Sequence, residues 1–247
     1  MRDQTAPRLD TSAAGGPATR PVADWEEELP GLLARLRLPT PGVVQVGAHV
    51  GQEVEPLTRC GFRRIVLMEP NQDHTDALST QLRFHHEQAG LPAPEDGLTA
   101  REIVVAAAGR ERGEATLYVT EWDQQASMLP PLLPLSARNA VVRQDIIDVI
   151  PVREIQHGCN VLVVDAQGAE LEVLAGTDLD RLQLAVIEGS TDARYRNGST
   201  LDTIAEYMEA NGWRQVATWP HARPNVDDVA WLSPRYRTEL VAIDGEG

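Results

Sequence analysis

Compact apolar runs recur along the chain and are separated by polar or amphipathic stretches. Runs that are apolar on both faces are typical of buried strands in a parallel sheet. Five are predicted as such strands: GVVQV at 42–46, RRIVLM at 63–68, REIVVAAAG at 101–109, NVLVV at 160–164 and LQLAVI at 182–187. GEATLYVTE at 113–121 adds a strand that we expect at a sheet edge.

The stretches between these runs place apolar residues at helical intervals. Residues 24–38 begin with acidic residues and continue with leucines three or four positions apart, so they predict a helix with Pro30 near its start. Further helices are expected at 71–86, after Asp165, and at 201–213. Strands that alternate with helices in this way predict an α/β fold with a doubly wound, mostly parallel sheet.

The last part of the chain breaks the alternation. WRQVATW at 213–219 and DDVAWLS at 227–233 are two strands joined by PHARPNV, which is too short for a helical crossover. They must therefore pair antiparallel. A second exception is the segment 122–140, where three prolines block a continuous helix and predict an irregular loop able to cover a pocket.

Composition narrows the class of protein. Residues 1–23 are expected to be a flexible leader and residues 24–247 one domain. A net charge of −15 would repel a phosphate backbone, which disfavours nucleic acid as a partner. The chain has two cysteines in unrelated contexts and no apolar run of the roughly 18 residues that a membrane span needs. A cytoplasmic protein without a membrane partner is the expectation.

A glycine turn and a later acid suggest a nucleoside site. Gly47 and Gly51 let the backbone after the first strand approach a ligand, and the next helix offers unpaired N–H groups to a carboxylate. Glu69 ends the second strand, roughly 20 residues on, where a carboxylate can accept ribose hydroxyls. His49 occupies the middle position of a GxGxxG pattern, so NAD is disfavoured.

These motifs together resemble the FkbM-type family of S-adenosylmethionine (SAM) dependent methyltransferases. The motifs that carry the resemblance are, in order, VVQVGAHVGQEVEPL, VLMEPN, VVAAAG, GEATLYV, ASML, NVLVVDAQGAELEVLAG and LAVIEGS. The resemblance covers about residues 40–235. It implies a Rossmann-like, seven-stranded class I methyltransferase sheet with an antiparallel C-terminal hairpin. It also implies O-methylation of a hydroxyl on a sugar, glycoside or other small natural product, as in antibiotic biosynthesis and secondary metabolism.

The resemblance transfers cofactor contacts to individual positions. The glycine turn maps to Gly47, Ala48 and Gly51, the ribose acid to Glu69, and the acid after the fourth strand to Asp165. The full set of expected SAM contacts is Gln45, Gly47, Ala48, His49, Gly51, Glu69, Pro70, Asn71, Ala107, Ser127 and Asp165. For Ser127, a bond to nearby backbone is the alternative.

Three residues are candidates for the chemistry. Asp165 is the first candidate for the base that removes the hydroxyl proton, with a helix N-cap as the alternative. His49 is the second, with a turn residue contacting SAM as its alternative. Glu188 could orient the acceptor, or share a divalent cation with Asp165, with a solvated strand-end carboxylate as the alternative; no metal is assigned. Of Asp227 and Asp228, at most one can point inward, because adjacent strand residues face opposite sides.

Two departures from the family pattern keep alternatives open. Gln45 and Gln167 stand where the family often has Asp and Glu, so a charge facing the cationic cofactor is lost at Gln45. The alternatives are an NAD-dependent oxidoreductase and a SAM-binding module without catalysis. The sequence identifies neither the methyl acceptor nor the oligomeric state, and it is compatible with a homo-oligomer.

Overall fold

A computed structural model describes residues 24–90, 101–132 and 140–236, so the predicted leader at 1–23 lies outside the described residues. Its main element is a seven-stranded sheet in the order β3-β2-β1-β7-β8-β10-β9. The strands are β1 (Gly42–Val46), β2 (Arg64–Met68), β3 (Arg101–Val104), β7 (Val161–Val164), β8 (Leu184–Ser190), β9 (Arg214–Pro220) and β10 (Val226–Leu232). The predicted α/β architecture is confirmed.

The strand directions also match the prediction. β1 pairs in parallel with β2 on one side and with β7 on the other, while β10 is antiparallel to both β8 and β9. The chain order reverses between β1 and β7, where such sheets bind ligands beyond the carboxyl ends of their strands. The C-terminal hairpin is therefore antiparallel, as the short PHARPNV link requires.

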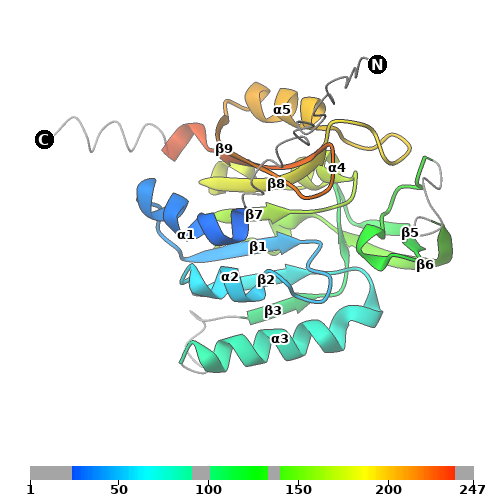
Figure 1. Ribbon diagram of the computed structural model, residues 1–247, viewed down its shortest axis with the longest axis horizontal. Coiled ribbons are helices and arrows are strands. Elements are labelled where there is room, and N and C mark those ends of the chain that lie inside the picture. The colour runs from blue at the N-terminus through cyan, green and yellow to red at the C-terminus, as the bar shows by residue number, and fades with distance from the viewer. Residues whose placement is uncertain (1–23, 91–100, 133–139, 237–247) are drawn as a thin grey trace, which may run out of the picture.

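A second sheet of three strands was not predicted. Its order is β4-β6-β5, formed by β4 (Ala107–Ala108), β6 (Val141–Ile150) and β5 (Gly113–Thr120). The single strand expected at 101–109 was wrong, because β3 stops at Val104 and β4 joins the other sheet. In Figure 1 the arrows of β1, β2 and β3 point toward this second sheet, which lies beyond their carboxyl ends.

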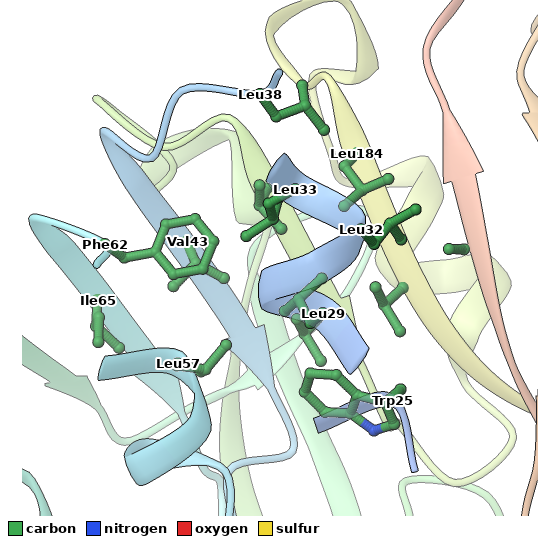
Figure 2. Close-up of a cluster of buried hydrophobic side chains, with 14 of the residues drawn as sticks. Trp25, Leu29, Leu32, Leu33, Leu38, Val43, Leu57, Phe62, Ile65 and Leu184 are labelled. Atoms are coloured by element: carbon green, nitrogen blue, oxygen red, sulfur yellow. The ribbon is translucent and has the colours of Figure 1, made fainter. Parts of the chain in front are cut away.

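Helices cover both faces of the main sheet. On one face lie α1 (Trp25–Arg35), α2 (Val54–Arg59) and α3 (Thr75–Gln88), and on the other lie α4 (Glu170–Ala175) and α5 (Leu201–Ala210). Alternate residues of β8 divide between the two cores: Leu184 and Val186 pack under α1, and Ala185 and Ile187 face α4 and α5. Figure 2 shows the first core, where Leu29, Leu32 and Leu33 descend from α1 onto the sheet. Among the described helices none is long and apolar enough to cross a membrane.

Helix α1 departs from expectation at its proline. Asp24 caps the helix by accepting from the Glu26 amide at 3.0 Å, but Pro30 lies in the helix interior and not in its first turn. A proline there leaves the carbonyl four residues earlier without its helical donor. That carbonyl belongs to Glu26, and it accepts from Arg59 Nη2 of α2 at 3.0 Å. The proline is tolerated because a neighbouring helix supplies the missing donor. The same bond ties the start of α1, which lines a cavity at the sheet, to α2.

Candidate active site

A cavity of about 580 Å³ lies at the carboxyl ends of β1, β2, β7 and β8, between the main sheet and the loop that follows β5. This volume is within the range of small-molecule sites. Nine of the predicted site residues line it: Gln45, Gly47, His49, Glu69, Pro70, Ala107, Ser127, Asp165 and Glu188. Ala48, Gly51 and Asn71 are buried just outside its wall. Residues from distant parts of the sequence thus meet beyond β1 and β7, where the strand order reverses.

The turn after β1 requires glycine. Gly47 has a φ of +82°, and a Cβ atom there would lie 1.9 Å from the backbone oxygen of Asp165. Gly51 has a φ of +91°, and its Cβ would meet Leu78 of α3 at 2.9 Å. Gly47 therefore allows the first and fourth parallel strands to meet under the ligand, whereas Gly51 allows α3 to pack against the turn.

Backbone amides hold Glu69 at the cavity wall. Its side chain accepts from the amide of His49 on one oxygen and from the amide of Asn71 on the other, both at 2.8 Å. Each carboxylate oxygen has a second lone pair. Glu69 is therefore positioned to accept ribose hydroxyls as well, and Asn71 contributes by orienting it.

A carboxylate that sequence reasoning missed stands beside Gln45. Glu53, at the start of α2, accepts from Gln45 Nε2 at 2.9 Å, and both residues line the cavity. Burial raises the pKa of Glu53, which the Gln45 hydrogen bond opposes. Gln45 Oε1 is buried without a hydrogen-bond partner among the described residues. Gln45 Oε1 and the carboxyl group of Glu53 together fit the ammonium group of SAM. Glu53 therefore supplies the acidic group that Gln45 lacks.

The other half of the cavity is built around Asp165. Gln167 Nε2 donates to Asp165 Oδ1 at 2.5 Å and lies 3.3 Å from Glu188 Oε1. The hydroxyl of Tyr195 donates to Gln167 Oε1 at 2.9 Å, which fixes the amide with its NH₂ group toward the two acids. Gln167 therefore places a neutral hydrogen-bond donor between Asp165 and Glu188. An acidic side chain at this position would repel both carboxylates.

Asp165 has the electrostatics of a base. Burial raises its pKa well above the ordinary value, the charge of Glu188 adds to the rise, and Arg223 opposes it. The N-cap alternative is wrong, because α4 begins after Ala169. Both carboxylate oxygens of Glu188 lie within 2.9 Å of Arg223 Nη2, so Glu188 forms an ion pair in this site. Asp165 is thus a buried carboxyl group with a raised pKa, whereas Glu188 beside it is held by an arginine.

Further acids enclose the same space. Asp228 is buried at the cavity wall, with its pKa raised to about 8 by burial and by Glu188. Asp227 is half-buried and does not line the cavity, which confirms that one of the pair points inward. Asp24 and Glu26 close one side from the start of α1. A cationic ligand would favour the ionised form of these acids, and SAM carries a sulfonium and an ammonium group.

Ser127 connects the two sheets. Its hydroxyl donates to the backbone oxygen of Gln167 at 2.7 Å and accepts from the Leu129 amide at 3.0 Å. It is 2% exposed and lines the cavity. Ser127 thus bonds to backbone, which was the alternative that the sequence left open. Its bond to Gln167 ties the loop after β5 to the loop after β7. Residues 133–139 of the predicted irregular loop lie outside the described residues.

His49 lies where the turn meets that loop. Its φ is +46°, and its ring packs edge-on against His74 with centroids 4.1 Å apart. Its Nε2 faces Asp123 Oδ1 at 3.4 Å. Neither His74 nor Asp123 was predicted, because each lies in a short helical turn and the two are about 50 residues apart in the sequence.

Comparisons with known proteins give a family match and two weak structural likenesses. The chain matches the methyltransferase FkbM domain over residues 45–214, and no curated protein matches it. Magnesium protoporphyrin IX methyltransferase from Synechocystis PCC 6803 with bound SAH is 9% identical, with 84% of this chain and 81% of that chain covered and a TM-score of 0.49. Precorrin-6y C5,15-methyltransferase from Geobacter metallireducens GS-15 is 14% identical, with 83% and 87% covered and a TM-score of 0.41.

These structural likenesses are weak, so the fold class is defined by the strand order of the protein itself. The domain match covers more than half of the chain and includes the glycine turn, Glu69 and Asp165. The chain belongs to the FkbM family of SAM-dependent methyltransferases.

Proposed function

We propose that this protein methylates a hydroxyl oxygen of a small molecule, such as a sugar, a glycoside or another natural product. The observation that carries the proposal is the place of Asp165. It ends β7 beside Gly47, lines the cavity, and has a pKa raised toward the range in which a carboxylate can act as a base. A hydroxyl needs such a base, because its proton must leave as the oxygen gains the methyl group.

The residues of the chain divide the remaining tasks. Bound SAM supplies the methyl group on a sulfonium. Gly47 permits close approach to the backbone, Glu69 accepts the ribose hydroxyls, and Gln45 with Glu53 receives the ammonium group. Gln167 holds Asp165 through Oδ1, which leaves Oδ2 as the oxygen that would take the acceptor proton. Positioning of the two reactants supplies much of the acceleration.

The substitution Asp165→Asn tests the proposal with little change in shape. With SAM carrying a labelled methyl group and a panel of glycosides and polyketides, wild-type protein should add one methyl mass to a hydroxyl-bearing compound. The variant should lose about 100-fold to 10,000-fold in turnover, the usual contribution of a general base. Its affinity for S-adenosylhomocysteine (SAH), measured by calorimetry, should be nearly unchanged.

Three results would contradict the proposal. Full turnover in the variant would remove Asp165 as the base. Transfer to amine-bearing compounds alone would replace oxygen by nitrogen as the acceptor atom. If no compound gains a methyl group while SAH binds tightly, the SAM-binding module without catalysis becomes the better description.

A further inference from the structure

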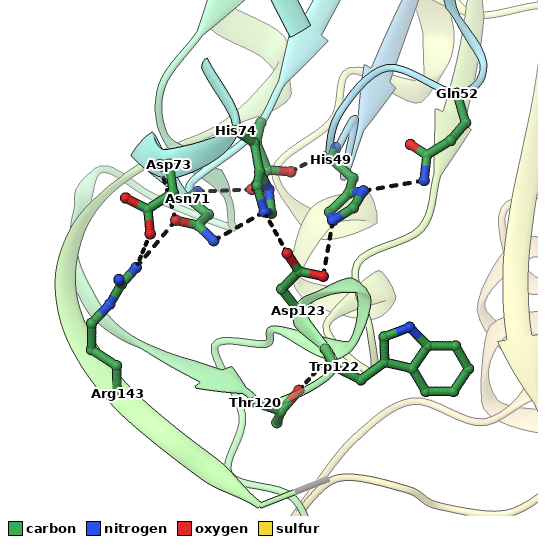
Figure 3. Close-up of polar contacts among 10 residues, drawn as sticks. His49, Gln52, Asn71, Asp73, His74, Thr120, Trp122, Asp123 and Arg143 are labelled. Carbon is green, nitrogen blue, oxygen red and sulfur yellow. Dashed lines mark hydrogen bonds and ion pairs between the residues drawn. The ribbon is translucent and has the colours of Figure 1, made fainter. Parts of the chain in front are cut away.

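Three side chains converge on one point near the ends of β1 and β2, away from Asp165. His49 comes from the glycine turn, His74 from the short helix η1 (Gln72–His74), and Asp123 from the short helix η3 (Asp123–Gln125) after β5. In Figure 3 the carboxylate of Asp123 faces both imidazole rings. One donor atom from each of the three residues lies within 4.8 Å of the others.

The distances match a metal coordination sphere. Asp123 Oδ1 lies 3.4 Å from His49 Nε2, and Asp123 Oδ2 lies 3.2 Å from His74 Nε2. Ligands about 2.1 Å from a tetrahedral Zn²⁺ ion are separated from one another by roughly 3.4 Å. The three groups could therefore close around one ion with small side-chain movements.

The opposite ring nitrogens also have the surroundings of metal-bound histidines. His74 Nδ1 lies 3.5 Å from Glu69 Oε1, and His49 Nδ1 lies 3.1 Å from the amide group of Gln52. A histidine that binds metal through one nitrogen usually donates its other N–H to a carboxylate or carbonyl oxygen. Glu69 can accept this proton from His74, and Gln52 can accept it from His49 once its amide turns to present oxygen.

Burial leaves hydrogen-bonding capacity unmet in the cluster. His74 is 5% exposed, and its Nδ1 atom has no hydrogen-bond partner within the described parts of the chain. His49 Nε2, the atom that faces Asp123, is likewise buried and makes no hydrogen bond there. Unsatisfied buried nitrogens are costly, and a bound ion would satisfy the one on His49 directly.

We propose that His49, His74 and Asp123 form a binding site for a divalent transition-metal ion of the Zn²⁺ type. Two imidazoles and one carboxylate favour such an ion over Mg²⁺ or Ca²⁺, which prefer oxygen ligands. The ion joins the loop after β5 to the glycine turn and to η1, and it orients His74 against Glu69. Its role is to fasten the second sheet over the cofactor end of the cavity, and it takes no part in methyl transfer.

Metal titration tests this site without SAM or an acceptor. Protein treated with a chelator and then freed of it is titrated with Zn²⁺ by calorimetry and with Co²⁺ by visible absorption. We expect one tightly bound ion per chain, a Co²⁺ d–d spectrum of a low-coordinate N/O site, and a higher melting temperature with Zn²⁺. Mg²⁺ should produce none of these changes.

Substitutions then locate the ion. Asp123→Asn alters a half-exposed side chain, and His49→Asn keeps a residue that tolerates positive φ, so both variants should fold. Each should bind Zn²⁺ at least about 100-fold more weakly, since even residues behind the ligands contribute 10-fold to 100-fold. The exposed His157, changed to Asn in the same way, is the control and should leave binding unchanged.

Three results would overturn the site. They are an absence of Zn²⁺ binding to the wild type, equal affinity in Asp123→Asn and the wild type, or an equal loss in His157→Asn. Circular dichroism of each variant separates lost binding from lost folding, and the Co²⁺ spectrum reports the ligands even if stability changes. Because no methyl transfer is measured, failure here leaves the proposed function intact, and the reverse also holds.

Discussion

The two halves of the cavity are built by different means. At the ends of β1 and β2, the backbone forms the cavity wall: Gly47 allows two strands to meet closely, and two backbone amides hold Glu69. At the ends of β7 and β8, charged side chains surround one another, with Asp165, Glu188 and Asp228 set against Arg223. The half at β1 and β2, which is the proposed cofactor half, depends on chain geometry. The half at β7 and β8, which is the proposed acceptor half, depends on electrostatics, which point substitutions can retune without changing the fold.

The largest expected effect comes from adding a methyl group to the cofactor half. Gly47→Ala places Cβ 1.9 Å from a backbone oxygen at a positive φ, so strain and overpacking together should cost roughly 2–6 kcal/mol in the free energy of unfolding. SAH binding should be lost as the strands move apart. Gly31→Ala is the matched control: no atom lies within 4 Å of its Cβ, and it lies within α1, so the protein should become slightly more stable. Urea unfolding measures both variants, and an unaffected Gly47→Ala protein would show that geometry does not dominate this half.

A pH series tests the acceptor half. The pKa of Asp228 is raised from its ordinary 3.8 to about 8, so between these values the folded protein holds a proton that the unfolded chain releases. Stability must therefore fall as pH rises through this window, by an amount on the order of a few kcal/mol for this group. Asp228→Asn should flatten the profile measured by urea unfolding between pH 5 and pH 8. An equally steep profile in the variant would assign the dependence to other acids.

The activity should respond to pH in the opposite sense. Asp165 accepts a proton only when it is ionised, and its pKa is raised, so turnover should increase with pH through its titration. Over the same range Asp228 makes the protein less stable. Rates measured at temperatures well below unfolding separate the two effects, and turnover that falls steadily from pH 5 upward would argue against a carboxylate base.

The smallest effect is expected from breaking an ion pair. Arg223→Ala removes the partner of Glu188 in a partly buried site, which should cost about 1–3 kcal/mol and raise the pKa of Asp165 further, because Arg223 now lowers it. The turnover profile should therefore move to higher pH. Arg112→Ala, in an exposed pair with Glu154, is the control and should cost no more than about 1 kcal/mol. Equal effects in the two variants would mean that the acceptor half is no more sensitive to charge than the surface.

The sequence predicted the main sheet because its strands are apolar on both faces. β1, β2, β7 and β8 are rich in consecutive apolar residues, although Gln45 interrupts β1, and the short hairpin link imposed antiparallel pairing. β6 was missed because it is mostly exposed and interrupts its apolar residues with Arg143, Gln144 and Asp145. Pairing with β5 satisfies the backbone hydrogen bonds of β6, so its sequence need not show a run of apolar residues.

The sequence foresaw which residues meet where they follow strand ends, and it missed residues that are brought together by long-range contacts. Gly47, Glu69 and Asp165 each follow a predicted strand, so their meeting could be foreseen. Glu53 and Arg223 carried no signal of their own, because their importance comes from Gln45 and Glu188 beside them. Pairings of this kind depend on packing that spacing along the chain does not encode.

Calorimetric titration of SAH into wild type and Glu69→Gln tests the cofactor half most directly. Loss of charge-assisted bonds to the ribose should weaken binding about 10-fold to 100-fold, while Glu121→Gln, an exposed change of the same kind, should bind as the wild type does. Equal SAH affinity in all three proteins would contradict the assignment of Glu69, and with it the placement of SAM across β1 and β2.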